Sequence, residues 1–279
     1  MDGKNALYVR PLDALAAQRL EGTEGAYFPF WSWDSRSLGY FAAGRLKKID
    51  ASGGPPEVLC DAPSGRGGSW NREGTIIFTP RHLGGVFRIS SAGGVPVSVT
   101  QLDAGRGEIT NRWPQFLPDG RHFLYYVLTP SDETSGAYVG SLEGGKPKFI
   151  LRCHTNATYA PPGYLLFVRE GTLMAARFDA RQLRMTGDVM PMGEHVQLSS
   201  GVVRPMLGVS ENGVLAFQGP PASSASGGSL EWFDRSGKQL GTIGQGEHAS
   251  FLDPRLSPDG RRLAVQSGCT TWRAASGPG

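Results

Sequence analysis

One short phrase recurs along the chain at intervals of about 45 residues. Its clearest copies are FLPDGRHFLYYV at Phe116–Val127 and LSPDGRRLAV at Leu256–Val265. A Pro-Asp-Gly turn favours a tight reversal, because proline fixes φ, aspartate bonds to its own backbone and glycine tolerates positive φ. The apolar and aromatic run that follows has the length of a β-strand. The repeated phrase therefore predicts a β-hairpin.

The hairpin belongs to a longer repeat. The glycine of the turn, or a serine in its place, recurs in steps of 39 to 50 residues at Ser35, Gly74, Gly120, Gly163, Gly213 and Gly260. A second hairpin with its own Gly-containing turn follows each copy, most clearly at Gly44–Leu59 and Gly85–Thr100. Four strands in such a period predict a propeller blade, whereas a sandwich gives no reason for a regular period and β-helix repeats are much shorter.

The two ends of the chain each supply half of a blade. Only one hairpin follows Gly260, and residues 6–13 and 17–23 match the missing third and fourth strands. We therefore predict an all-β fold, a six-bladed β-propeller of four-stranded antiparallel blades whose last blade is closed by the N- and C-terminal hairpins. In this arrangement Ala6–Val9 lies antiparallel to Leu263–Gln266.

The predicted boundaries are one propeller domain over residues 1–266 and a loose tail over residues 267–279, where the repeat ends. At one corner Trp33 stands in place of the proline of the repeat, which predicts a wider turn there.

Charge and hydropathy exclude several classes of function. The chain has 28 basic and 25 acidic residues, without the concentrated positive charge typical of nucleic-acid binding. The longest apolar run, Tyr164–Val168, is too short to span a bilayer, and no signal peptide is visible. We expect a cytoplasmic monomer from the sequence as written. Cys60, Cys153 and Cys269 have no metal-binding spacing and are predicted to be free thiols.

Motifs of catalysis are missing from the sequence. It contains no G-x-S-x-G, no H-x-x-x-H and no D-x-D-x-D-G segment, and the glycines of GTIGQG at Gly241–Gly246 do not match a kinase phosphate loop. We therefore predict a protein that is not an enzyme and that holds no cofactor and no metal.

The repeat also resembles a known family. The phrases SPDGRRLAV, GRLKKIDASGGPPEVL, NRWPQFLPDGRHFLYYV and YAPPGYLLFVREGTLMAARFD are similar to TolB-type, WD-like propeller repeats over Ala6–Val265. More narrowly, they resemble the propellers that follow the kinase domain in bacterial membrane-anchored serine/threonine kinases. This resemblance implies a sensory or scaffolding role, and a periplasmic or other extracytoplasmic location where the propeller is part of such a longer protein.

Candidate binding residues lie just before the inner strands, where a propeller places them at one mouth of its channel. They are Tyr27, Arg112, Trp113, Tyr159, Arg204 and Asp253. Aromatic residues and arginine are enriched in binding hot spots. We predict a non-catalytic binding module for a protein, peptide or small-molecule ligand at this mouth. The alternative is a propeller enzyme with a channel site, such as a metal-assisted lactonase or hydrolase.

Overall fold

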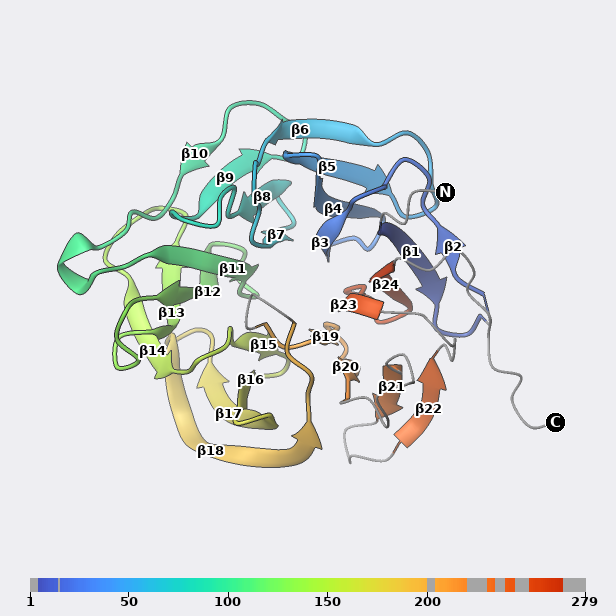
Figure 1. Cartoon of the computed structure of the whole chain (residues 1–279). Helices are drawn as coiled ribbons and strands as arrows, with labels where there is room; N and C mark the ends of the chain where they lie inside the picture. Colours follow the sequence, from blue (N-terminus) through green and yellow to red (C-terminus); the bar gives the residue numbers. More distant parts are fainter. Residues whose placement is uncertain are drawn as a thin grey trace.

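The computed structural model describes residues 5–14, 16–199, 204–219, 230–233, 239–243 and 251–267. These residues form 24 β-strands and one short 3-10 helix, and the strands pair into six four-stranded antiparallel sheets. The sheets stand around a common axis (Figure 1). No helix in this described part of the chain is long and apolar enough to cross a membrane.

Five sheets are each formed by four consecutive strands. The first contains β3 (Tyr27–Trp31), β4 (Ser37–Ala42), β5 (Arg45–Asp50) and β6 (Glu57–Asp61), and the second β7 (Gly68–Trp70), β8 (Thr75–Phe78), β9 (Phe87–Ser90) and β10 (Val97–Ser98). The third contains β11 (Thr110–Phe116), β12 (His122–Leu128), β13 (Gly136–Ser141) and β14 (Lys148–Arg152). The fourth contains β15 (Thr158–Ala160), β16 (Tyr164–Arg169), β17 (Thr172–Asp179) and β18 (Arg184–His195), and the fifth β19 (Leu207–Val209), β20 (Leu215–Gln218), β21 (Leu230–Phe233) and β22 (Gln239–Ile243).

The remaining sheet joins the two ends of the chain. It has the order β2 (Gln18–Arg19), β1 (Ala6–Pro11), β24 (Arg262–Ser267) and β23 (Phe251–Leu256). Strand β1 is antiparallel to β24, with Leu7 opposite Gln266 and Val9 opposite Ala264, so the predicted pairing of these strands is confirmed. Ser267 belongs to β24, one residue inside the predicted tail, and residues 268–279 lie outside the described residues.

The prediction of six blades needs a correction. It counted the sheet formed by the two ends as a blade, although each half of that sheet comes from a different end of the chain. The blades formed by one continuous four-stranded segment number five, not six, and run from β3 to β22. The sixth four-stranded sheet is a composite closure held together by the β1–β24 ladder, which covers two strand edges.

The repeated turns have the predicted geometry. At all six anchors the N–H donates to the carbonyl three residues earlier, for example from Gly120 to Leu117 at 2.9 Å. The anchors Ser35, Gly74, Gly120, Gly163, Gly213 and Gly260 all have positive φ, between 63° and 154°. The corner at Trp33 is not wider, because the N–H of Ser35 donates to Ser32 at 3.0 Å as in the other copies. The indole of Trp33 is 45% exposed beside this turn.

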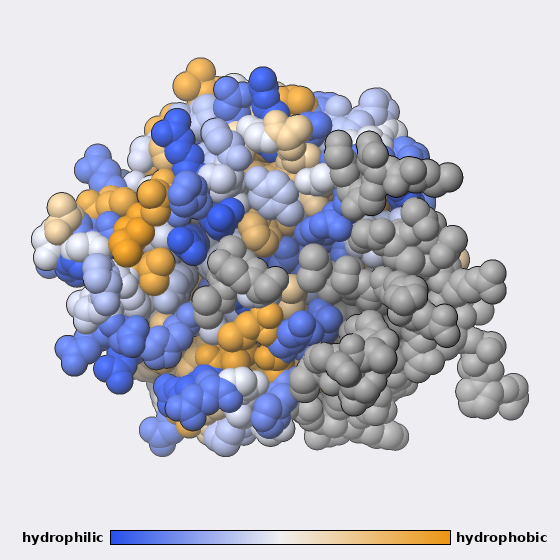
Figure 2. Space-filling model, in the orientation of Figure 1, coloured by the Kyte–Doolittle hydropathy of each residue, from blue (hydrophilic) through white to orange (hydrophobic). Residues whose placement is uncertain are grey.

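The core lies between neighbouring sheets, because each sheet is apolar on both faces. Phe41 and Phe78 from the first two sheets are fully buried in one cluster, and Ile77 and Phe123 are fully buried in the next. All inner strands, β3, β7, β11, β15, β19 and β23, surround the axis (Figure 1). On the face of the ring that Figure 2 shows, hydrophilic residues cover most of the coloured area and hydrophobic ones form separate patches.

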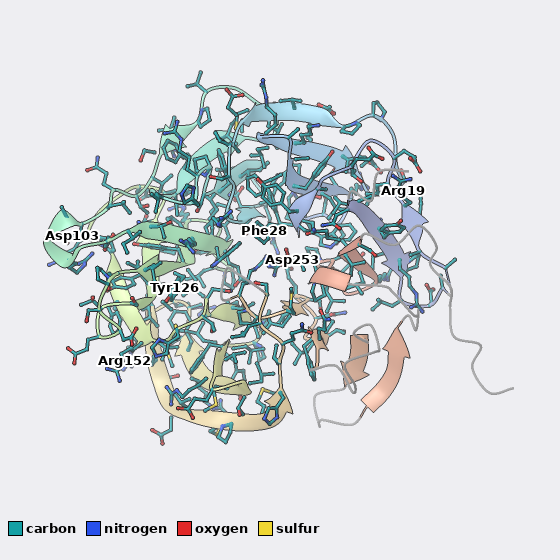
Figure 3. All side chains as sticks on the ribbon, viewed as in Figure 1. Arg19, Phe28, Asp103, Tyr126, Arg152 and Asp253 are labelled. Atoms are coloured by element: carbon teal, nitrogen blue, oxygen red, sulfur yellow. The ribbon has the colours of Figure 1, made fainter. Side chains whose placement is uncertain are left out.

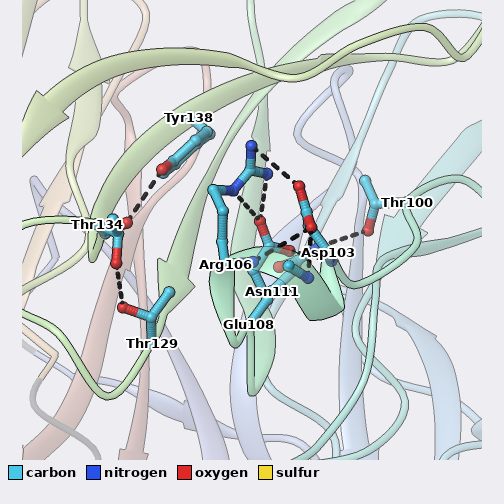
Figure 4. Close-up of polar contacts among 9 residues, drawn as sticks. Thr100, Asp103, Arg106, Glu108, Asn111, Thr129, Thr134 and Tyr138 are labelled. Carbon is cyan, nitrogen blue, oxygen red and sulfur yellow. Dashed lines mark hydrogen bonds and ion pairs between the residues drawn. The ribbon is translucent and has the colours of Figure 1, made fainter.

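One loop departs from the regular repeat. Between β10 and β11 a projecting segment carries the 3-10 helix Ala104–Arg106. The Nη2 of Arg106 lies 2.5 Å from Oε1 of Glu108, whose side chain is buried, and the Arg106 guanidinium lies over the ring of Tyr138 (Figure 4). The loop is therefore fixed to the third sheet and away from the axis.

Candidate functional site

A bulge near the start of three inner strands brings a side chain to the axis. Phe28, Trp113 and Asp253 have φ values of 50°, 56° and 54°, and each stands directly before a proline where the pairing with the second strand changes register. Bulges redirect side chains, and such φ values persist in non-glycine residues only where the surroundings hold them. Phe28 and Asp253 accordingly lie together at the centre of the ring (Figure 3).

These bulges build a plug across the axis, which consists of Phe28, Trp113, Arg204 and Asp253. The rings of Phe28 and Trp113 meet edge to face, with centroids 4.7 Å apart. The Arg204 guanidinium lies 4.6 Å from the Trp113 centroid and 5.3 Å from that of Phe28. Its Nη1 forms an ion pair with Oδ1 of Asp253, and both side chains are only 4% exposed. The plug is thus a cation held between two rings and a carboxylate.

Burial opposes both charges of the plug. It lowers the pKa of Arg204 and raises the pKa of Asp253, while each charge partly offsets the effect on the other. The backbone N–H of Phe28 also favours the charged carboxylate. A buried pair of this kind depends on both partners, because removing one leaves the other charge without compensation.

On one side of the plug lies a cavity of about 440 Å³, lined by residues of all six sheets. Its rim is formed by the repeat turns, so we call it the turn-side cavity. The aromatic residues of its lining are Phe28, Phe30, Trp31, Trp33, Trp70, Trp113, Phe116 and Tyr159. Its wall is joined between sheets, because Gln115 accepts from the N–H of Tyr159 at 2.8 Å and donates to the Tyr159 carbonyl at 3.2 Å.

Two polar atoms of the lining have no hydrogen-bond partner although they are buried. They are Nε of Arg204, which is a donor, and Oδ1 of Asn156, which is an acceptor. Buried polar groups normally have a partner, and an unpaired group costs free energy. The wall of the cavity therefore contains one donor and one acceptor without a partner.

On the other side of the plug, where the inner strands begin, a different set of residues is found. Arg66 and Arg112 precede the axial residues Gly67 and Trp113, and Tyr27 precedes Phe28; none of the three lines the turn-side cavity. The Arg66 guanidinium lies 6.0 Å from the Phe28 centroid. We call the set of Tyr27, Arg66 and Arg112 the arginine mouth.

The structure divides the predicted site residues between these places. Of the six, Trp113, Tyr159 and Arg204 line the turn-side cavity. Asp253 is the buried partner of Arg204, and Tyr27 and Arg112 belong to the arginine mouth. The six residues therefore do not form one surface.

Sequence reasoning missed Phe28 and Arg66. A signal for the plug was present, because four inner segments carry a residue followed directly by proline, at Phe28-Pro29, Trp113-Pro114, Arg204-Pro205 and Asp253-Pro254.

Metal-binding clusters and cysteine thiols can be assessed in the part of the chain that the structure describes. No group of three or more His, Cys, Asp or Glu residues is arranged there to hold a metal ion. Burial raises the pKa of Cys60 to about 11 and that of Cys153 to about 12. Both thiols are thus protonated at neutral pH and are poor nucleophiles.

Comparisons with known proteins support the fold. No family model matches the sequence, and no curated protein matches it. A protein described as TolB from Agrobacterium tumefaciens is similar in structure, with a TM-score of 0.64 and 17% identity over 98% of this chain and 99% of that one. The calcium-binding protein regucalcin from the same organism has a TM-score of 0.59 and 14% identity, over 89% and 92% of the two chains.

A gluconolactonase from Xanthomonas campestris has a TM-score of 0.60 and 16% identity, over 87% of this chain and 85% of that one. At these identities the likeness concerns the fold alone. The molecule has a β-propeller fold with a plugged axis. More narrowly, that fold is TolB-like.

Proposed function

We propose that this protein is a non-catalytic binding module whose ligand enters the turn-side cavity. The observation that carries this proposal is the unpaired Nε of Arg204, a residue that lines an aromatic cavity of about 440 Å³. Small-molecule sites typically have volumes of about 300–1,000 Å³ and combine an apolar lining with a few polar groups that fix orientation. Here the charge of Arg204 is already matched by Asp253, so the donor suits a neutral acceptor.

The ligand class follows from the two unpaired atoms. The Nε of Arg204 needs an acceptor, and Oδ1 of Asn156 needs a donor. An amide offers both, and the aromatic walls suit apolar side chains beside it. A short peptide or a small amide is therefore the ligand that we propose.

The wider context of the module is part of the proposal and depends on the resemblance of the repeats. We place it in the sensory or scaffolding part of a kinase-type protein, outside the membrane when it belongs to a longer anchored chain. Expressed alone, it is expected in the cytoplasm, and its recovery from the periplasm in a processed form would contradict this.

The alternative is a metal-assisted lactonase or hydrolase in the channel. It has support from the gluconolactonase and regucalcin, which share the fold. Metal analysis of the purified protein distinguishes the two functions. One divalent ion bound per chain, together with lactone hydrolysis that is lost on chelation, would replace our proposal by the alternative.

The binding proposal is tested with a panel of blocked dipeptides and small amides, by calorimetric titration. Trp33→Ala removes an exposed ring from the cavity rim, and we expect at least fivefold weaker binding, the lower end of hot-spot effects. Phe149→Ala is the matched control, because Phe149 is similarly exposed on β14 and does not line the cavity. Equal losses in both variants, or no binding by any compound, would refute the proposal.

A further inference from the structure

We propose that the arginine mouth is a separate anion site that takes a phosphate group, as inorganic phosphate or a phosphate monoester. The site lies across the plug from the turn-side cavity and does not depend on the proposed function. Its residues come from neighbouring sheets, and one backbone hydrogen bond joins the segments that carry the two arginines. Trp113 donates its N–H to the Arg66 carbonyl at 2.9 Å, which places the backbone of Arg66 beside Arg112.

The two arginines have no carboxylate partner among the residues that the structure describes. Nη1 of Arg66 donates only to the backbone carbonyls of Gly65 at 2.9 Å and Ser64 at 3.3 Å, and its buried Nε has no partner. Arg112 donates to Thr110 Oγ1 and to the His82 carbonyl, both at 3.4 Å, where hydrogen bonds are weak. The guanidinium groups are therefore positioned but not neutralised.

The surroundings make this uncompensated charge costly. Burial lowers the pKa of Arg66 and of Arg112, and the charge of Arg66 lowers the pKa of Arg112 further. The two like charges thus repel each other in a partly desolvated mouth. A bound anion would offset both costs.

The number of charges and the donor geometry favour a phosphate over a carboxylate. A carboxylate carries one negative charge, whereas a phosphate group carries about 1.5 to 2 at neutral pH and offers several acceptor oxygens. Guanidinium groups present their N–H donors in planar forks that match phosphate and carboxylate oxygens. Two unpaired arginines therefore match one phosphate in both charge and number of donors.

The test is titration of the purified chain with inorganic phosphate in chloride buffer at constant ionic strength, followed by calorimetry. We expect one phosphate per chain, and at least tenfold weaker binding in Arg66→Gln and in Arg112→Gln. Arg152→Gln is the matched control and keeps full affinity, because Arg152 is exposed at the outer strand β14, away from the axis. Melting curves in chloride alone verify that each variant is folded.

Three results would overturn the proposal. The first is phosphate binding that survives in the Arg66→Gln/Arg112→Gln double variant. The second is the absence of any heat beyond the chloride-matched control. The third is acetate binding as tight as phosphate binding, which would show that the site has no preference for a doubly charged anion. Equal binding of inorganic phosphate and of phenyl phosphate would extend the site to monoesters, whereas binding of the inorganic ion alone would limit it to the free ion.

Discussion

Two arginines lie against the ring of Phe28, and their environments differ. Arg204 lies 5.3 Å from the ring centroid, is 4% exposed and has Asp253 as its partner. Arg66 lies 6.0 Å from the same centroid, is only partly buried and contacts backbone carbonyls. A fully buried guanidinium needs a countercharge, whereas a partly buried one remains in contact with water and bears its absence at a smaller cost. The charge of the first arginine is therefore matched within the structure, although its Nε has no partner, whereas the charge of the second is available to an anionic ligand.

The largest effect on stability is expected from breaking the ion pair between Arg204 and Asp253. Asp253→Asn keeps the shape of the side chain, and asparagine tolerates the positive φ of 54° at this position. The substitution leaves Arg204 buried without a countercharge, and we expect a loss of about 3–5 kcal/mol in the free energy of unfolding. Urea unfolding monitored by tryptophan fluorescence measures it.

The double variant Arg204→Met/Asp253→Asn is the control for the charge effect, because it removes both charges of the plug. We expect it to be more stable than Asp253→Asn alone. If Asp253→Asn loses less than about 1 kcal/mol, the ion pair is not the buried, mutually dependent pair described above.

A smaller effect is expected for a hydrogen-bonded Asp–His pair at the repeat turns. The Nδ1 of His122 lies 2.6 Å from Oδ2 of Asp119, and both side chains are partly exposed. Burial alone would raise the pKa of Asp119, but hydrogen bonds from the His122 ring and from the N–H groups of His122 and Arg121 outweigh it, so the pKa is lowered. A lowered pKa stabilises the fold above the ordinary value of 3.8, and the contribution is lost as the pH falls through the folded value.

Asp119→Asn tests this pair, because it keeps the turn and removes the charge. Since solvent screens a partly exposed pair, we expect the free energy of unfolding to fall by less than about 1 kcal/mol at pH 7. In acid, where Asp119 is protonated in both the folded and the unfolded protein, we expect no difference from the parent protein. Urea unfolding of the variant and of the parent protein, at pH 7 and in acid, measures this difference. A difference that persists in acid would mean that packing, and not charge, is responsible.

The turns could be predicted from the sequence, but the site could not. Local chemistry determined the turns, so the anchors from Ser35 to Gly260 and the β1–β24 closure were predictable. The site was not, because it depends on which inner-strand residue reaches the axis. Bulges at Phe28 and Trp113 decide this, because both residues enter the plug and line the turn-side cavity. Arg112, the neighbour of Trp113, does not line that cavity. The partner of Arg204 lies 49 residues away, and no local pattern shows that contact.

The smallest effect on stability is expected from removing the charge of Arg66, which has no carboxylate partner among the described residues. Arg66→Met keeps an aliphatic chain beside Phe28 and removes a charge that forms no ion pair within the described residues. Hydrogen bonds to carbonyls and the long cation–π contact with Phe28 are lost, while the cost of holding the charge near Arg112 is relieved. The free energy of unfolding should therefore change by no more than about 0.5 kcal/mol in chloride buffer. Arg204→Met, measured beside it, leaves Asp253 buried alone and should lose about 3 kcal/mol or more. Urea unfolding of both variants decides the contrast. Equal losses would show that Arg66 also has a structural role and would remove the distinction between the two arginines.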